Sequence, residues 1–285
     1  MFQFLILKLF ILINGLGAAS GIVYNKQNIY VVSDDLTYLF QYNLKTQQQS
    51  KYAFNTILQA DKMTKKNKLD FESLTLAHGN LLALGSGSKE NRNELHSFNL
   101  KTKEVARYNV SDTYNELKKR FNISNNDFNI EGFIYHKGKT YLFNRGNGKS
   151  NLNGVFIFEG LPHYTKLLKT EFVTIQLPRI KNNLTTFSDA IIVNNKIIFT
   201  ATIETKSTVV KDGEVKESIL GTINLKDFKV DNYHVIAESQ KIEGITLLKK
   251  SSKGYVFLVC EDNDDDSTEA NIYKINVSKD FKEIY

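Results

Sequence analysis

Short runs of aliphatic, aromatic and β-branched residues, separated by Asn, Gly, Lys and Asp, make up most of this chain. Apolar runs of about four to eight residues between polar turns are typical of β-strands. Five stretches share one plan: an apolar or small residue, then Ser or Glu, then a strand, a short polar turn and a second strand. They are ASGIVYNKQNIYVVSDD from Ala19, FESLTLAHGNLLALGSGS from Phe71, IEGFIYHKGKTYLFNRGN from Ile130, FSDAIIVNNKIIFTATIE from Phe187 and IEGITLLKKSSKGYVFLVCEDN from Ile242.

A third strand follows each of these pairs, and a weaker fourth strand often follows the third. The Ser or Glu positions that open the five stretches lie 52, 59, 57 and 55 residues apart. A repeat of this length with about four strands per unit is the signature of a β-propeller. We therefore predict an all-β chain in which residues 1–285 form a single five-bladed β-propeller domain. The blades start near residues 19, 71, 130, 187 and 242.

One helix interrupts the strand pattern, in the segment SDTYNELKKRF from Ser111. Ser111 or Asp112 is suited to cap it, and Tyr114, Leu117 and Phe121 share one face. We expect this short helix between the second and third blades.

The first twenty residues, MFQFLILKLFILINGLGAAS, allow two interpretations. An apolar run that ends in small residues resembles a signal peptide, which would place the protein in the periplasm or outside the cell. However, no Lys or Arg precedes the run and Lys8 lies in its middle. The run is too short to span a bilayer, so no transmembrane segment is predicted. We favour residues 4–13 as a β-strand that closes the last blade, and with it a cytoplasmic location.

The composition narrows the classes of partner. The net charge is +6 at pH 7, but no dense stripe of Lys and Arg with interleaved aromatic residues is present. We therefore predict no nucleic-acid binding. The one cysteine, Cys260, cannot form an internal disulfide. The sequence does not indicate an oligomeric state.

The Ser and Glu positions of the repeat predict a metal site. The first strand of each propeller blade lines the central channel, so these five positions converge on its axis. Crowded carboxylates in a low-dielectric channel repel until they take up protons or a cation. Oxygen ligands without His or Cys favour calcium over zinc or copper. The predicted calcium ligands are Ser20, Glu72, Glu131, Ser188 and Glu243. The alternative is a hydrated, metal-free ring held by backbone amides and water.

A second layer of polar residues follows the second strands, which return to the mouth of the channel where the ring begins. The glycine-rich GSGSK segment offers backbone amides to an anion, and Arg145 can fork onto a phosphate or a carboxylate. The alternative is that GSGSK and the RGNG segment that begins at Arg145 are solvated turns. The predicted residues for binding a small anionic ligand are Ser86, Ser88, Arg92, Asn144, Asn147 and Glu261.

Several motifs together resemble a bacterial β-propeller family of uncharacterised function: SGIVY, DFESL, LGSGS, NIEGF, NRGN, FSDAII and KIEGIT. The order Ser, Glu, Glu, Ser, Glu is also similar to that of the calcium-activated apyrases, five-bladed propellers that hydrolyse nucleoside diphosphates. Their FSS, YEGI and HEA motifs correspond to the segments that begin at Phe187, Ile242 and Ile130. This resemblance implies that the five ring residues bind calcium. The Glu-Gly motifs are more loosely similar to esterase-like phytase propellers.

The chain departs from the apyrases in its arginines. Apyrases carry an arginine just after the Asp-Asp pair, where this chain has Leu36 and Thr37. Arg145 stands alone where apyrases carry two arginines. We therefore expect fewer arginine contacts to a phosphate in this chain than in the apyrases.

Two functions follow from these residues. The first is a calcium-dependent hydrolase of an anionic ester, such as a phosphate ester or a nucleotide. In it, Asp189, Asp34 or Asp35 acts as the base and Arg145 stabilises charge. The alternative is a non-catalytic propeller that binds a ligand, in which calcium holds the blades together. Structural and catalytic calcium use the same ligands, so the sequence leaves both functions open.

Overall fold

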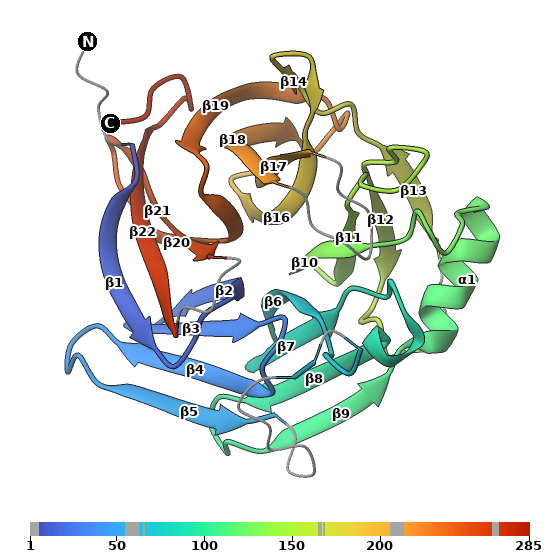
Figure 1. The fold of residues 1–285 in the computed structure, drawn as a ribbon, viewed down its shortest axis with the longest axis horizontal. Coiled ribbons are helices and arrows are strands. Elements are labelled where there is room, and N and C mark those ends of the chain that lie inside the picture. The colour runs from blue at the N-terminus through green and yellow to red at the C-terminus, as the bar shows by residue number, and fades with distance from the viewer. Residues whose placement is uncertain are drawn as a thin grey trace.

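The computed structural model describes residues 6–54, 63–64, 66–164, 167, 169–205, 214–263 and 268–285. In these residues the strands form five four-stranded antiparallel sheets around a central axis (Figure 1). The prediction of an all-β, five-bladed propeller is confirmed. None of the helices in the described ranges is long and apolar enough to cross a membrane.

Each blade is an antiparallel sheet whose first strand lines the channel. Blade 1 consists of β2 (Ala19–Asn25), β3 (Asn28–Ser33), β4 (Tyr38–Asn43) and β5 (Gln49–Ala53). Blade 2 consists of β6 (Phe71–Ala77), β7 (Asn80–Gly85), β8 (Glu94–Asn99) and β9 (Val105–Asn109). Blade 3 consists of β10 (Ile130–His136), β11 (Lys139–Asn144), β12 (Gly154–Glu159) and β13 (Glu171–Thr174). Blade 4 consists of β16 (Thr186–Val193), β17 (Lys196–Thr205), β18 (Glu214–Asn224) and β19 (Val230–Glu238). Blade 5 consists of β20 (Lys241–Lys250), β21 (Gly254–Asp262), β22 (Glu269–Ser278) and β1 (Lys8–Asn14). Two further elements lie outside the blades. One is a small hairpin of β14 (Arg179–Ile180) and β15 (Asn183–Leu184), and the other is the 3₁₀ turn η1 (Glu90–Arg92).

The two ends of the chain meet in blade 5. Strand β1 runs antiparallel to β22, from the pair Lys8–Lys274 to the pair Asn14–Glu269. It takes the outer position expected for residues 4–13, and it covers a sheet edge that would otherwise be open (Figure 1). The first two residues of the expected strand lie outside the described ranges.

The apolar core consists of five clusters, one between each pair of neighbouring blades. For example, Phe187 of blade 4 packs edge to face on Phe143 of blade 3, with the ring centres 5.3 Å apart. Burying each such side chain stabilises the fold by about 1.5–3 kcal/mol. Each blade packs between two others, so these interfaces stabilise the ring. The first strands contribute apolar side chains to them, and the Ser and Glu residues near their starts are left to line the channel.

Helix α1 (Ser111–Phe121) is the one α-helix in the described residues, and it covers the interface of blades 2 and 3 (Figure 1). Tyr114 and Leu117 are fully buried, and the Tyr114 hydroxyl donates to Gly85 O at 2.7 Å. The prediction that Ser111 or Asp112 caps this helix is wrong. Ser111 is its first residue, and its amide donates to Oδ1 of Asn109 at 2.8 Å.

Candidate functional site

Each blade has a β-bulge at the position that defines the sequence repeat. The register between the first and second strands shifts at Ala19/Gly21, Phe71/Ser73, Ile130/Gly132, Phe187/Asp189 and Ile242/Gly244. A bulge adds one unpaired residue to a strand and redirects its side chain. The five extra residues are Ser20, Glu72, Glu131, Ser188 and Glu243, the predicted ring. The sequence repeat therefore reflects a β-bulge that recurs at the same position in every blade.

The residue after most of these bulges is small because the next blade lies against it. A Cβ atom on Gly21 would lie 2.8 Å from the amide nitrogen of Leu74 in blade 2. A Cβ atom on Gly244 would lie 3.1 Å from the amide nitrogen of Ile22 in blade 1. The channel-lining strands thus approach backbone to backbone, which brings the bulge residues close together.

The two serines of the ring connect neighbouring blades. Ser20 Oγ donates to Phe71 O, and Ser188 Oγ donates to Ile242 O at 2.7 Å. Both serines are buried. Their hydroxyl protons are therefore engaged at the interfaces of blades 1 with 2 and 4 with 5.

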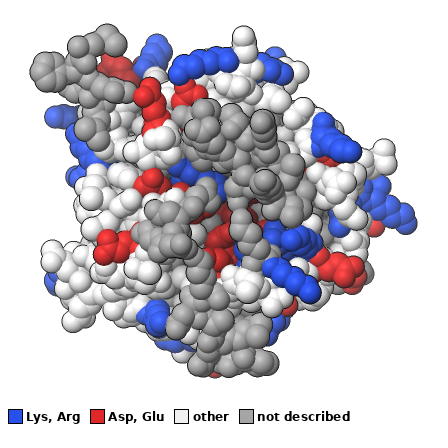
Figure 2. Space-filling view, viewed as in Figure 1, with Lys and Arg blue, Asp and Glu red and all other residues white. Residues whose placement is uncertain are grey.

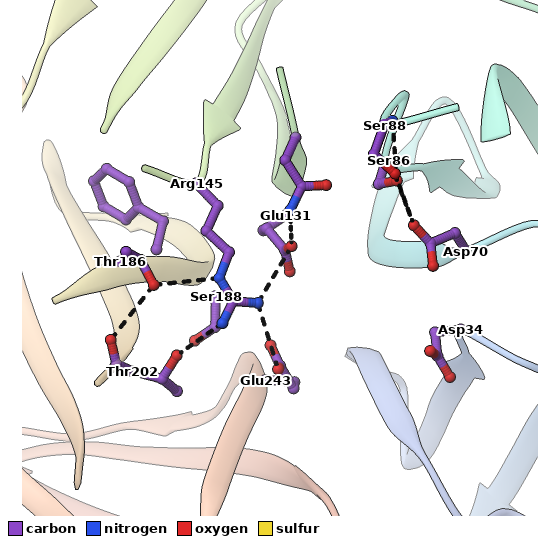
Figure 3. A network of polar contacts seen from close by, with 12 residues as sticks. Asp34, Asp70, Ser86, Ser88, Glu131, Arg145, Thr186, Ser188, Thr202 and Glu243 are labelled. Carbon is purple, nitrogen blue, oxygen red and sulfur yellow. Dashed lines mark hydrogen bonds and ion pairs between the residues drawn. The ribbon is translucent and has the colours of Figure 1, made fainter. Parts of the chain in front are cut away.

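Two of the three ring glutamates share one arginine. Arg145 Nη1 lies 3.4 Å from Glu131 Oε1 and 4.0 Å from Glu243 Oε1, and all three side chains are buried (Figure 3). Glu243 also pairs with Lys241 Nζ at 3.1 Å, and Lys241 pairs with Asp262 at 3.0 Å. On this side of the mouth, the carboxylates are therefore already paired with the cationic side chains of Arg145 and Lys241.

A second polar cluster surrounds Asp70, which the sequence analysis did not single out. Asp70 accepts hydrogen bonds from Arg92 Nη1 at 2.6 Å and from Ser86 Oγ, and it pairs with Lys68 Nζ at 2.8 Å. Ser88 Oγ accepts from Arg92 Nη1 at 2.7 Å. The predicted binding residues Ser86, Ser88 and Arg92 are thus brought together, around a carboxylate.

Asp70 also belongs to a group of carboxylates at the channel mouth. One oxygen each from Asp34, Asp70 and Glu72 lies within 4.8 Å of the others. Lys68 Nζ, which forms an ion pair with Asp34 as well as Asp70, is the cation beside them. Asp34 and Asp70 face the Arg145 network from across the channel (Figure 3).

Two carboxylate oxygens at this mouth are buried without a hydrogen-bond partner: Oδ1 of Asp34 and Oε2 of Glu131. Burial raises the pKa of Asp34 to about 7 and, with Glu243 nearby, that of Glu131 to about 8, although Lys68 and Arg145 respectively oppose the shift. Burial and the Glu131 carboxylate raise the pKa of Glu72 well above its ordinary value. For Asp70 burial also acts upward, but Lys68 and Arg92 outweigh it and lower the pKa. The raised pKa values of Asp34, Glu72 and Glu131 favour their protonated forms, and a bound cation would favour their ionised forms.

Among the described residues, carboxyl groups outnumber side-chain cations at the mouth. Six carboxyl groups surround it, namely Asp34, Asp70, Glu72, Glu131, Glu243 and Asp262. Four side-chain cations pair with them, namely Lys68, Arg92, Arg145 and Lys241. With every group ionised, six minus four leaves a formal charge of −2. Figure 2 shows acidic atoms at the centre of this face with basic ones beside them.

Two candidate bases have local structural contacts. Asp189 follows the bulge of blade 4, where the other blades have Gly or Ser, and is fully buried. Its oxygens accept the amides of Ala190 at 2.7 Å and Ile245 at 2.9 Å, which connects blade 4 to blade 5. Asp35 accepts the Ser33 hydroxyl at 2.6 Å within a turn. These hydrogen bonds engage both carboxylates, whereas Asp34 has a buried oxygen without a hydrogen-bond partner and is the remaining candidate.

Of the other predicted binding residues, Asn144 and Glu261 are engaged within their own blades. Asn144 accepts the amide of Asn129 and donates to two backbone carbonyls. Glu261 accepts the Tyr273 hydroxyl at 2.6 Å. Asn147 lies in the loop after β11, and its buried Oδ1 has no hydrogen-bond partner.

Residues 15–277 match a family described as a family of unknown function (DUF6929). The chain belongs to this family. No curated protein matches the chain.

The solved structures that share the fold of this DUF6929 member include the following two, both at low sequence identity. One is the glutaminyl cyclase of Myxococcus xanthus, with a TM-score of 0.55 and 12% identity over 95% of this chain and 97% of that one. The other is Mala s 1, the major allergen of Malassezia sympodialis, with a TM-score of 0.54 and 12% identity over 92% of this chain and 93% of that one. At this identity the likeness concerns the fold alone.

The sequence repeat contains a second pattern, which includes Asp70 and Lys241. Two positions before each bulge residue, the chain has a residue at the rim of the mouth. Asp70, Asn129, Thr186 and Lys241 at these positions all contact the network described above, and Ala18 is the fifth. Aligning the five repeats on the bulge residue and then inspecting the flanking columns would have revealed this second ring.

Proposed function

We propose that this propeller binds one divalent cation, calcium, at the channel mouth through Asp34, Asp70, Glu72 and Glu131. One observation carries the proposal: three carboxylates have oxygens within 4.8 Å of one another, and the buried Glu131 beside them has an oxygen without a partner. Like charges at this spacing repel strongly in a low-dielectric site, and a cation relieves that repulsion.

The proposed site lies to one side of the five-residue ring. Glu243 is already paired with Arg145 and Lys241, and Ser20 and Ser188 donate to backbone carbonyls. Arg145 pairs with Oε1 of Glu131, but Oε2 of Glu131 has no hydrogen-bond partner. Glu72 and Glu131 therefore remain as ligands, while Asp34 and Asp70 replace the serines and Glu243. Lys68 competes with the cation, because its ammonium now pairs with two of the four carboxylates.

The chemistry of the four ligands selects the metal. Carboxylate oxygens without His or Cys are hard ligands, and calcium accepts irregular shells of six to eight oxygens. Carboxylates, nearby backbone carbonyls and water can supply such a shell. The resemblance to the calcium-activated apyrases supports the same choice of metal.

We further propose that the bound cation and the adjacent Lys68 and Arg92 hold a small anionic ligand at the mouth. The two cations lie on the Asp70 side, so an anion on the metal would approach them. A non-catalytic role agrees with the structural contacts of Asp189 and Asp35. Binding is thus the function that this geometry supports best.

Hydrolysis of an anionic ester is the second candidate, and Asp34 favours it. Its carboxyl has a pKa of about 7 and an oxygen without a partner, which suits a general base near neutral pH. The structural neighbour named glutaminyl cyclase is an enzyme on the same fold, and it supports catalysis by analogy only.

Calorimetric titration with calcium tests the binding. The chelator-treated wild type should bind about one calcium per chain, and Glu72→Gln should weaken binding by about tenfold or more, because charge count tunes calcium affinity. Glu283→Gln, an exposed glutamate near the C-terminus, is the matched control and should bind like wild type. Absence of calcium binding, or equal binding by Glu72→Gln, would refute the site. Phosphate-ester hydrolysis with and without chelator then decides between the two functions.

A further inference from the structure

A separate pocket of about 480 Å³ lies between blade 2 and helix α1. Its lining is polar: it combines the glycine-rich loop after β7, including Ser88 and Lys89, with one face of the helix. It differs from the channel mouth in charge, because Lys89 and Lys118 line it together with a single carboxylate, Glu90. None of the predicted metal ligands lines this pocket.

The helix presents a dedicated polar face to the pocket. Ser111, Asn115 and Lys118 are spaced by four and three residues, so they lie on one side of α1. All three line the pocket, whereas Tyr114 and Leu117 lie on the buried side. The Lys118 ammonium donates to Oδ1 of Asn125, another lining residue, at 2.9 Å.

The pocket is built on a rigid base. Gly87 has a φ of +73°, and a Cβ atom there would lie 2.6 Å from the ring of Tyr114 and 2.7 Å from that of Phe128. Glycine is therefore required at this position, because it allows both the left-handed backbone and the close ring contact. The Tyr114 hydroxyl bonds to Gly85 O, which fixes the helix against the loop that forms the opposite wall.

Asn93 supplies an independent sign of a ligand. Its side chain is 4% exposed and lines the pocket. Its amide nitrogen donates to Ser111 Oγ at 3.2 Å, but Oδ1 has no hydrogen-bond partner. A buried acceptor without a partner is destabilising, so a donor from a bound molecule would stabilise it. Ser111 accepts the bond from Asn93, which leaves its own proton for an acceptor on the same molecule.

We propose that this pocket binds a small hydroxylated anion. Its phosphate or carboxylate group would lie near Lys89, Lys118 and the N-terminus of α1, where the helix dipole favours negative charge. A hydroxyl group of the ligand would donate to Oδ1 of Asn93, and other hydroxyl groups would bond to the amides of Asn115 and Asn125. None of the proposed cation's ligands lines this pocket, although Ser88, which does, also contacts Arg92 and Asp70 at the channel mouth.

Calorimetry on the full chain in chelator tests this site with three probes: glucose 6-phosphate, gluconate and glucose. At least one of the two anions should bind about tenfold or more tightly than neutral glucose. Comparison of the affinities for glucose 6-phosphate and gluconate shows whether the site prefers a phosphate or a carboxylate. If neither anion binds more tightly than glucose, the proposal is overturned. If binding requires calcium, the anion sits on the metal at the mouth and this site is likewise overturned.

Variants then locate the bound anion. Lys89→Gln should weaken binding by about tenfold, since it removes one charge from a half-exposed side chain. Asn93→Ala should also weaken the binding, and a melting curve for this variant verifies that it is folded. Lys119→Gln, an exposed lysine of the same helix that lies outside the pocket, is the control and should bind like wild type. Unchanged binding by both Lys89→Gln and Lys118→Met would place the anion elsewhere and refute the proposal.

Discussion

Arg145 Nη1 lies 3.4 Å from Glu131 Oε1, and both side chains are only 3–4% exposed. The same guanidinium is fixed by the hydroxyls of Thr186 at 3.2 Å and Thr202 at 3.3 Å. A buried arginine with this many partners joins blades 3 and 4 and faces blade 5 through Glu243. Its position is the reason that we place the proposed cation beside Asp34 and Asp70, where Glu131 would contribute the oxygen that has no hydrogen-bond partner.

Arg145→Ala should therefore act first on stability. Removing one partner of a buried pair leaves uncompensated charge and typically destabilises by about 3–5 kcal/mol. Saturating calcium should recover part of this loss, because Glu131 would gain a second counter-charge. Urea unfolding with chelator and with calcium measures both effects. Arg120→Ala, which breaks an exposed pair with Glu116 and a hydrogen bond to Leu167 O, is the control and should change stability by about 1 kcal/mol. A stable Arg145→Ala protein that has lost only its activity would instead favour a catalytic arginine.

Asp189→Asn should lower stability and leave calcium affinity unchanged. The carboxyl accepts two backbone amides, and the amide side chain of Asn can accept only on its oxygen. One buried amide would lose its partner, at a cost of about 1–3 kcal/mol. Chemical denaturation and calcium titration of the same variant separate the two effects. Loss of hydrolysis with full stability would show that Asp189 acts as the base.

Calcium affinity should rise with pH between about 6 and 9. The carboxyls of Asp34 and Glu131 have pKa values of about 7 and about 8, so calcium must displace protons from them below those values. The increase should reach at most about tenfold per pH unit for each proton released. Calorimetry in buffers of different ionisation enthalpy counts the released protons. Affinity that is flat across this range would contradict the protonated state of the site.

The same shifts predict how the metal-free protein responds to pH. A carboxyl whose folded pKa lies above its unfolded value binds more protons in the folded state between the two values. Stability from such a group is complete below about pH 4 and is lost as pH rises through the folded pKa, near 7 to 8. The chelated protein should therefore become less stable over this window, and saturating calcium should reduce that loss.

Neighbouring positions of β1 test its role as the closing strand. Ile13 is fully buried in the cluster between blades 5 and 1, whereas Leu12 is 42% exposed. Ile13→Ala should destabilise by about 2–5 kcal/mol. Leu12→Ala, the matched control, should change stability by about 0.5 kcal/mol or less. Equal, small effects would indicate that this segment does not contribute to blade closure.

The fold was predictable because each blade repeats one local pattern. Alternating apolar residues define strand pairs, and the Ser or Glu at each bulge marks the repeat, so blade number follows from the chain alone. Local sequence also placed α1, although it assigned the cap to Ser111 or Asp112 and overlooked Asn109.

The partners of each polar side chain were not predictable in the same way. Asp70 and Lys241 precede their bulges by two residues and look like ordinary turn residues in isolation. Their roles depend on contacts with side chains far apart in the sequence, such as Arg92 and Asp262. Asp189 illustrates the converse: a carboxylate beside the ring looks catalytic in sequence, but one of its oxygens accepts the amide of Ala190 in its own strand and the other accepts that of Ile245 in the next blade.

Anomalous diffraction from crystals grown with calcium, or soaked in terbium as a calcium substitute, tests the central claim most directly. We expect one strong peak at the channel mouth, about 2.3–2.6 Å from oxygens of Asp34, Asp70, Glu72 and Glu131. Lys68 should then have moved away from the carboxylates with which it now pairs. A peak on the axis, bound by Ser20, Ser188 and Glu243, or no peak at saturating calcium, would contradict the account.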